Sequence, residues 1–286
     1  MVVESQPLNP SIFTQVFKGQ EHQSFTLAGG QPAALLVHGF PGTPAELMPL
    51  AKVLNNAGWT VEGLLLPGFG SQIDTLFNRK YSEWVEAIRA ALQELQLRHH
   101  PLLLGGFSLG GALTLNVAAS QSVDGLLLMA PFWKLDGPFW WLLPIFQRIF
   151  PVIHPYRLMR LDFTNPEVRE GLAKFLPKVD FDDPAVQTGI RELPVPISII
   201  DEIRRLGRQT WQLAPQVKTN LLVLQGSQDK IVHPRHTRQL VARIQTIKVY
   251  REVNTGHDIP DPTSPAWPQV IEEILKYSQE LVKPDV

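Results

Sequence analysis

The segment 101–111 constrains the possible fold of this chain more than any other stretch. It begins with an apolar run, 101–107, that has the character of a buried strand, and its last residues begin a helix. Ser108 lies between the two, so a single tight turn must join them. Gly106 and Gly110 flank the serine, and a Cβ at either position would clash because strand and helix nearly touch at such a turn. The pattern G-x-S-x-G therefore predicts a strand, a strained turn and a helix in direct succession.

Apolar runs and segments with helical spacing alternate along much of the chain. We expect strands at 33–38, 59–66, 101–107, 125–130, 220–225 and 246–252. We expect helices at 44–57, 82–97, 109–120, 235–244 and 265–282. Ser82 is the expected N-cap of the second helix. The fold class is therefore α/β, with a mostly parallel sheet covered by helices on both faces.

The alternation stops between 131 and 206, where ten of the 25 prolines occur. We interpret 132–206 as a mostly helical cap inserted into a core formed by 1–131 and 207–286. Aromatic side chains gather at the start of this segment: Phe132, Trp133, Phe139, Trp140 and Trp141. They are either the packed face of the cap or the wall of an apolar binding site, and both descriptions can hold at once.

The composition excludes several classes of function. The chain of 286 residues has no cysteine, which excludes disulfides, thiolate catalysis and cysteine-ligated metals. Its formal net charge of −1 provides no field that would attract nucleic acid or an anionic membrane. The longest apolar stretch, 138–153, is too short and too often interrupted by prolines to span a bilayer. The first residues show no secretory signal, and we expect a cytoplasmic protein.

Ser108 becomes a candidate nucleophile because two further residues follow it in the order that serine catalysis requires in such folds. A serine hydroxyl is a weak nucleophile at neutral pH and needs a base, and the base needs an orienting carboxylate. Asp229 comes directly after the strand at 220–225, and His257 lies on the loop after the next strand. The carboxyl ends of parallel strands meet at one edge of a sheet, so we expect the three side chains there together.

Each of these residues also has an interpretation without chemistry. Ser108 could cap a helix, Asp229 could form a turn, and His257 could lie on the surface. Three other carboxylates are poorer partners for the base because none directly follows a predicted core strand: Asp124, Asp136 and Asp201. Asp258 is expected to point away from the base. Two histidines near the candidate acid are expected to be exposed or to cap a helix: His233 and His236.

An oxyanion hole needs two backbone N–H donors that point to one place. The residue after the nucleophile supplies one, here Leu109, which also benefits from the dipole of the helix it begins. The loop 38–42 supplies the other, and Phe40 is the expected donor because Pro41 has no N–H group. His38 is expected to pin this loop rather than to act as a second base.

Five segments together resemble the α/β-hydrolase superfamily, and within it the bacterial carboxylesterase and monoacylglycerol lipase-like branch. They are His38-Gly-Phe-Pro-Gly-Thr, Leu66-Pro-Gly-Phe-Gly, Gly106-Phe-Ser-Leu-Gly-Gly, Gly226-Ser-Gln-Asp and Gly256-His. The resemblance implies an α/β-hydrolase fold and the following roles: nucleophile Ser108, acid Asp229, base His257, and oxyanion donors Phe40 and Leu109. In two places the chain departs from the pattern. The family often has histidine where this chain has Phe69, and the loop 38–42 lacks the three glycines of the hormone-sensitive lipase class.

The resemblance implies a serine hydrolase that cleaves carboxylic esters through an acyl-enzyme on Ser108. The aromatic side chains of the cap favour medium- or long-chain acyl esters or monoacylglycerols as substrates. We expect no metal and no organic cofactor. A thioesterase or a peptidase would use the same three residues, and a binding protein on an inactive hydrolase core is a further alternative. The expected partner is a small-molecule ester, and exposed aromatic side chains of the cap would allow brief contact with a lipid surface. The sequence does not indicate an oligomeric state.

Overall fold

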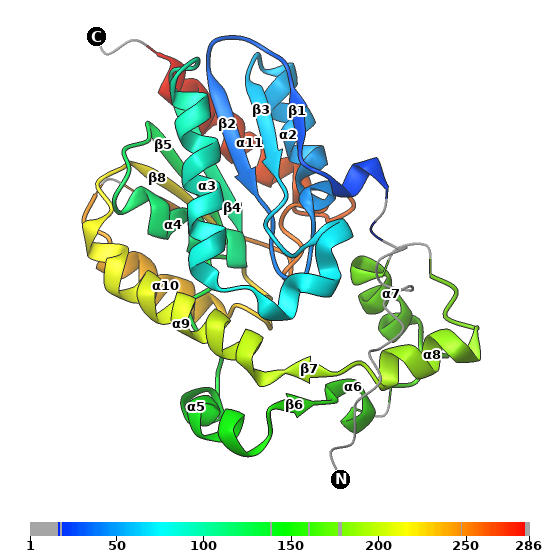
Figure 1. Ribbon diagram of the computed structural model, residues 1–286. Coiled ribbons are helices and arrows are strands. Elements are labelled where there is room, and N and C mark those ends of the chain that lie inside the picture. Colours follow the sequence, from blue (N-terminus) through cyan, green and yellow to red (C-terminus); the bar gives the residue numbers. More distant parts are fainter. Residues whose placement is uncertain are drawn as a thin grey trace.

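The computed structural model describes residues 17, 19–137, 139–159, 161–176, 179–246 and 248–283. Within these residues the chain forms a seven-stranded sheet (Figure 1). Its strands, in spatial order, are β1 (Phe25–Leu27), β3 (Thr60–Leu64), β2 (Ala33–Val37), β4 (Leu102–Phe107), β5 (Gly125–Met129), β8 (Leu221–Gly226) and β9 (Lys248–Val253). Every neighbouring pair is parallel except β1 and β3. The predicted, mostly parallel sheet is confirmed.

The central strands β2, β4, β5 and β8 are buried along their whole length. Strands covered by helices on both faces have no polar side to show, so they form continuous apolar runs that the sequence reveals. The edge strand β1 has only three residues, and all of them are partly or fully exposed. It contains no apolar run, and for this reason the sequence does not predict it.

Helices cover both faces of the sheet. They are α2 (Met48–Asn56), α3 (Tyr81–Gln96), α4 (Leu109–Ala118), α9 (Ile197–Leu213), α10 (Pro234–Arg243) and α11 (Trp267–Val282). Figure 1 shows α3, α4 and α9 packed against one another on one face, and α2 and α11 in contact on the other. Turns of 3-10 helix occupy Gln20–His22 (η1), Pro44–Leu47 (η2), Gly70–Asn78 (η3) and Ala214–Gln216 (η4).

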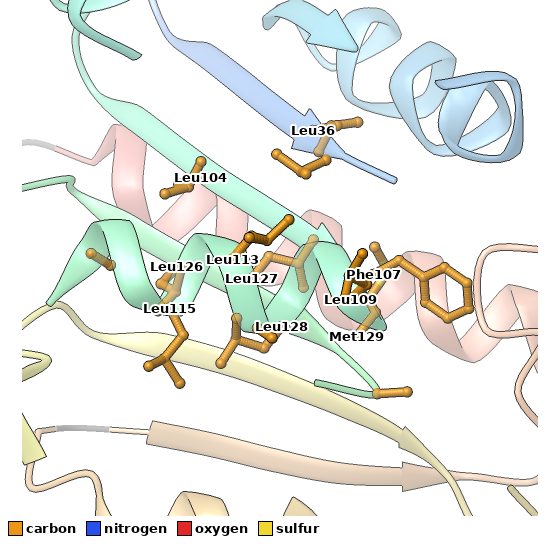
Figure 2. Close-up of a cluster of buried hydrophobic side chains, with 14 of the residues drawn as sticks. Leu36, Leu104, Phe107, Leu109, Leu113, Leu115, Leu126, Leu127, Leu128 and Met129 are labelled. Carbon is orange, nitrogen blue, oxygen red and sulfur yellow. The ribbon is translucent and has the colours of Figure 1, made fainter. Parts of the chain in front are cut away.

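The helix α4 lies at the centre of the core. All of its residues are buried, because the sheet covers one side and α3 and α9 cover the other. Figure 2 shows leucines of α4 and of β5 in the same hydrophobic cluster, among them Leu113 and Leu127. A helix that is apolar on every side can be stable only in such a position.

The helix α3 begins one residue earlier than predicted. Ser82 was expected as its N-cap, and this is wrong, because the helix starts at Tyr81 and Lys80 occupies the cap position. The Lys80 N–H group donates a hydrogen bond to Glu83 Oε1 at 2.9 Å. The glutamate in the first turn thus satisfies the backbone N–H group of the cap residue itself.

The segment between β5 and α9 extends beyond the carboxyl end of the sheet (Figure 1). Its elements are α5 (Phe139–Ile149), β6 (Val152–Ile153), α6 (Pro155–Leu158), α7 (Pro166–Phe175), α8 (Pro184–Arg191) and β7 (Val195–Pro196), with β6 and β7 paired antiparallel. A small hydrophobic cluster separate from the main core lies here: Phe163, Leu172, Leu176, Phe181 and Ile190. The boundary expected at 206 falls inside α9. Among the described residues, no helix combines the length and the apolarity needed to cross a membrane.

The close approach of α4 to β2 generates a stability prediction. A Cβ on Gly110 would lie 2.5 Å from His38 O, in a place where only backbone atoms could move. We expect Gly110→Ala to lower the free energy of unfolding by at least about 2 kcal/mol, as measured by urea denaturation.

Gly171→Ala is the matched control. Gly171 lies within α7, and a Cβ there would meet no atom within 4 Å. This substitution should leave the stability unchanged or raise it by up to about 1 kcal/mol, because alanine favours helix. Equal effects of the two substitutions would contradict the packing argument.

Candidate active site

Ser108 occupies the turn between β4 and α4 with φ 53° and ψ −112°, a backbone conformation that residues other than glycine rarely adopt. Three backbone hydrogen bonds hold it there: Ser108 N–H donates to Met129 O at 2.8 Å, and Ser108 O accepts from Phe132 N–H at 3.1 Å and from Ala112 N–H at 3.2 Å. A Cβ on Gly106 would lie 2.5 Å from the carbonyl carbon of Gly110. The strained turn between two obligatory glycines therefore forms as the pattern predicts.

His257 bridges the two other candidate residues. Its Nε2 lies 3.0 Å from Ser108 Oγ, and its Nδ1 lies 2.7 Å from Asp229 Oδ2. A carboxylate only accepts hydrogen bonds, so Nδ1 carries the ring hydrogen and Nε2 is left to accept the hydrogen of the serine hydroxyl. In this tautomer the imidazole can take a proton from the serine.

Asp229 is held rigidly at the end of β8. Its side chain is fully buried, and its Oδ1 accepts hydrogen bonds from the N–H groups of Ile231 (2.8 Å) and Val232 (2.9 Å). Gln225 Nε2 donates to Oδ2 at 3.2 Å, beside the histidine. These hydrogen bonds fix the direction in which the carboxylate faces His257.

The loops that carry the acid and the base are packed against each other. A Cβ on Gly226, at the end of β8, would lie 2.7 Å from Thr255 O. The backbone N–H of Ser227 donates to Val253 O at 2.8 Å, and that of Gln228 donates to Thr255 O at 3.0 Å. The short distance between the two loops allows the side chains to meet.

The other candidate partners of His257 form hydrogen bonds or ion pairs elsewhere. Asp124 accepts a hydrogen bond from Leu102 N–H at 2.6 Å, and Asp258 accepts one from the Thr255 hydroxyl at 2.7 Å. Asp201 pairs with two arginines of its own helix: Arg204 and Arg205. The carboxylate that forms a hydrogen bond with the ring of His257 is that of Asp229.

Asp136 joins the segment after β5 to the start of α10. Its carboxylate pairs with three basic side chains there: His233, Arg235 and His236. His236 is only 1% exposed, so the expectation of an exposed or capping residue is wrong for it. The Nε1–H group of Trp133 donates to His236 O at 2.8 Å, and its ring stacks on Trp211 with 4.2 Å between centroids. Tertiary packing at this junction buries the histidine.

The aromatic residues of the inserted segment have mainly packing contacts. Phe132 and Trp140 belong to the main hydrophobic core, with ring centroids 5.8 Å apart. Trp133 is held in the junction just described. These contacts fit the packed face of a cap, the first of the two interpretations. The side chains of Phe139 and Trp141 lie outside the described part of the structure.

The loop 38–42 passes directly beside Ser108. A Cβ on Gly39 would lie 3.3 Å from Ser108 Cβ. Phe40 follows Gly39 in this loop, and Leu109 follows Ser108 at the start of α4. One expected oxyanion donor is therefore the neighbour in sequence of a residue that lies beside the serine, and the other is the neighbour of the serine itself. Among the described residues, neither group donates a backbone hydrogen bond.

His38 and Phe69 support that loop from beneath. His38 Nε2 accepts a hydrogen bond from Leu66 N–H at 3.1 Å, so Nδ1 carries the hydrogen and donates to Gly39 O at 2.8 Å. Burial lowers the pKa of His38 to about 4, which keeps the ring neutral. Phe69 is fully buried, with its ring 4.9 Å from that of His38 and 5.8 Å from that of Phe40. The family resemblance predicts histidine at this position, and the phenylalanine present packs against the rings of His38 and Phe40.

Glu46 is a residue of this site that the sequence does not reveal. It lies in η2, and its Oε1 accepts a hydrogen bond from Gly39 N–H. Burial raises its pKa to about 7, although the bond from Gly39 opposes this shift. No motif or periodicity marks the residue, because only the folded loop brings its carboxyl group under Gly39.

Comparison with known proteins identifies the family. The family described as serine aminopeptidase, S33, matches residues 31–259. The chain belongs to this family. Among solved structures, a metagenome-derived lipolytic enzyme is similar with a TM-score of 0.71 and 21% identity, covering 91% of this chain and 98% of that one. The predicted α/β-hydrolase fold is confirmed.

Two bacterial enzymes are similar over part of the chain. The thermostable monoacylglycerol lipase of Bacillus sp. (strain H-257) is 34% identical over 96 residues, which are 34% of this chain and 38% of the lipase. The carboxylesterase of Bacillus subtilis (strain 168) is 28% identical over 106 residues, 37% of this chain and 43% of the esterase. The matches span less than half of either relative. They support the predicted resemblance to the esterase and monoacylglycerol lipase branch.

The raised pKa of Glu46 predicts how stability depends on pH. The carboxyl group holds its proton more tightly in the folded protein, with a pKa of about 7, than in the unfolded chain, near 4.5. Its contribution to stability is fully present below pH 4.5 and is lost as the pH rises through 7. The melting temperature of the wild type minus that of Glu46→Gln should therefore decrease as the pH is raised from 5 to 8. A constant difference would mean that Glu46 titrates normally.

Proposed function

We propose that this chain is a serine hydrolase that cleaves carboxylic esters. The observation that carries the proposal is the position of His257, which bonds to Ser108 with one ring nitrogen and to Asp229 with the other. A nucleophile, a base and an orienting acid in one chain of hydrogen bonds form the arrangement that activates serine. The similarity to a monoacylglycerol lipase and a carboxylesterase supports esters as the substrates.

In the proposed acylation step, Ser108 Oγ attacks the ester carbonyl carbon while His257 Nε2 accepts the hydroxyl proton. The buried Asp229 carboxylate stabilises the imidazolium that forms. The negative charge moves to the carbonyl oxygen, where the N–H groups of Phe40 and Leu109 bind it. When the tetrahedral intermediate collapses, the bond to the alcohol oxygen breaks and His257 returns the proton to the leaving alcohol. The acyl group remains on Ser108.

Deacylation repeats these events with water as the nucleophile. His257 takes a proton from water, and the hydroxide attacks the acyl carbon of the serine ester. The same two N–H groups bind the second oxyanion. Collapse of this intermediate releases the carboxylic acid and restores the Ser108 hydroxyl. This chemistry requires no metal and no organic cofactor.

Medium- or long-chain acyl esters, including monoacylglycerols, are the proposed substrates. The segment 132–206 is the proposed cap over the site, and the name of one relative, a monoacylglycerol lipase, supports an apolar acyl chain. A thioesterase or a peptidase remains a second candidate, because the same three residues would serve both.

A cytoplasmic location is also a proposal, and fractionation of cells that express the protein at natural levels tests it.

Ser108→Ala tests the central assignment. The substitution removes the attacking oxygen and should lower kcat on p-nitrophenyl butyrate by at least about 1,000-fold. It should also abolish labelling by a fluorophosphonate probe. Ser120→Ala is the control, because Ser120 is an exposed serine after α4, and it should retain both properties. Wild-type activity of Ser108→Ala would reject the assignment, and a wild type that neither hydrolyses nor becomes labelled would indicate an inactive binding protein.

A matched substrate series tests the acyl preference. We expect kcat/KM for p-nitrophenyl octanoate to exceed that for the acetate by at least about tenfold, because each added methylene buried in an apolar site stabilises the bound acyl chain. The octanoyl thioester and the octanoyl amide with similar leaving groups are measured in parallel. Preference for acetate would contradict the proposed substrate class. A higher kcat/KM for the thioester or the amide would favour the second candidate.

A further inference from the structure

Gly39 is held at both of its backbone polar groups. His38 Nδ1–H donates to Gly39 O at 2.8 Å, and Gly39 N–H donates to Glu46 Oε1 in a short hydrogen bond. Gly39 immediately precedes Phe40, the proposed oxyanion donor. The direction of the Phe40 N–H group depends on the peptide plane that joins it to Gly39 O. The bond from His38 holds this peptide directly, and the bond to Glu46 holds the preceding peptide, so together they restrict the rotation of Gly39 and with it the orientation of the donor.

The carboxyl group of Glu46 fills the inside of the loop. A Cβ on Gly42 would lie 2.5 Å from Glu46 Oε2, and one on Gly39 would lie 3.4 Å from Oε1 and 3.3 Å from Ser108 Cβ. The same glycine thus lies between the carboxyl group and the serine. A side chain that occupies the inside of a loop with its acceptor oxygen prevents the loop from collapsing or rotating.

Glu46 is itself held in place. Glu46 N–H donates to Thr43 O at 3.2 Å, and the Thr43 hydroxyl lies 2.9 Å from Nδ1 of the buried His22. Its neighbour Leu47 is fully buried in the main core. The core therefore fixes the position from which the Glu46 carboxyl group accepts the hydrogen bond of Gly39 N–H.

We propose that Glu46 is the positioning residue of the oxyanion loop, which holds Gly39 so that the N–H group of Phe40 points to the oxygen of the reacting carbonyl. This inference rests on the proposed function. The Gly39 N–H group belongs to the His38–Gly39 peptide, which precedes the peptide that carries the Phe40 donor. Removal of its acceptor therefore frees the backbone of Gly39 to rotate, and a misdirected donor stabilises the transition state less while substrate binding changes little.

The acceptor oxygen, rather than a full negative charge, is the feature that the loop needs. Burial raises the pKa of Glu46 to about 7, so part of the population is protonated at neutral pH. A protonated carboxyl group still accepts a hydrogen bond through its carbonyl oxygen. The amide oxygen of glutamine has the same reach, and Glu46→Gln is therefore the rescue variant.

The experiment compares Glu46→Met, which keeps the volume but removes the acceptor, with Glu46→Gln. Glu86→Gln is the control, because Glu86 lies on α3 with its side chain 67% exposed. We expect Glu46→Met to lower kcat on p-nitrophenyl butyrate by about 10- to 100-fold while KM changes by less than about threefold. Its affinity for a trifluoromethyl ketone, which forms an oxyanion on Ser108, should fall by the same factor as kcat. Glu46→Gln should remain within about fivefold of the wild type.

A merely structural role would produce a different pattern. Each variant is assayed well below its own melting temperature, so that a loss of stability alone leaves kcat unchanged. Glu46→Ala, measured in the same way, replaces Glu46→Met if the latter does not fold. A kcat within twofold of the wild type for the variant without an acceptor, or an equal loss in Glu46→Gln, would overturn the proposal.

The result is separable from the test of the proposed function. If Ser108→Ala is inactive and Glu46→Met retains full kcat, only the role of Glu46 is rejected. If Ser108→Ala retains activity, the proposed function itself fails, and the oxyanion loop loses its assigned role along with it. Phosphonylation of Ser108 by a fluorophosphonate provides a second rate, which should fall in Glu46→Met in parallel with kcat.

Discussion

The close packing of α4 against β2 and β4 is the constraint on which the rest of the structure depends. Gly106 and Gly110 allow backbone to touch backbone there, and no larger residue fits at either position without moving main-chain atoms. Because of this contact Ser108 has a positive φ, and its side chain lies at the carboxyl edge of the sheet. The surrounding apolar core fixes the contact, since α4 is buried on every side.

The site around Ser108 is assembled from four segments that are far apart in sequence. His38 follows β2, Ser108 follows β4, Asp229 follows β8 and His257 follows β9. Parallel strands end at the same edge, so the register of the sheet brings the four together. Hydrogen bonds between the loops after β8 and β9 then complete the alignment. Rigid elements thus hold each polar group, as electrostatic stabilisation of a transition state requires.

The sequence predicted the elements that are apolar and long, and missed those whose stability comes from tertiary contact. The buried strands were found within a few residues of their ends, and so were the helices α2, α3, α4, α10 and α11. The edge strand β1 was missed because it has no apolar run, and α9 was missed because prolines and aromatic residues precede it. The burial of His236 and the place of Glu46 under Gly39 also left no local signal.

The sequence alone determined the fold class, the glycine-flanked turn and the order of the three candidate catalytic residues. These follow from local steric limits and from the period of apolar residues, which each segment carries by itself. Only the tertiary structure decided which carboxylate meets His257, how His38 and Phe69 support the loop, and that Glu46 bonds to Gly39. Such contacts join residues distant in sequence, and their geometry exists only once the sheet and its loops have packed together.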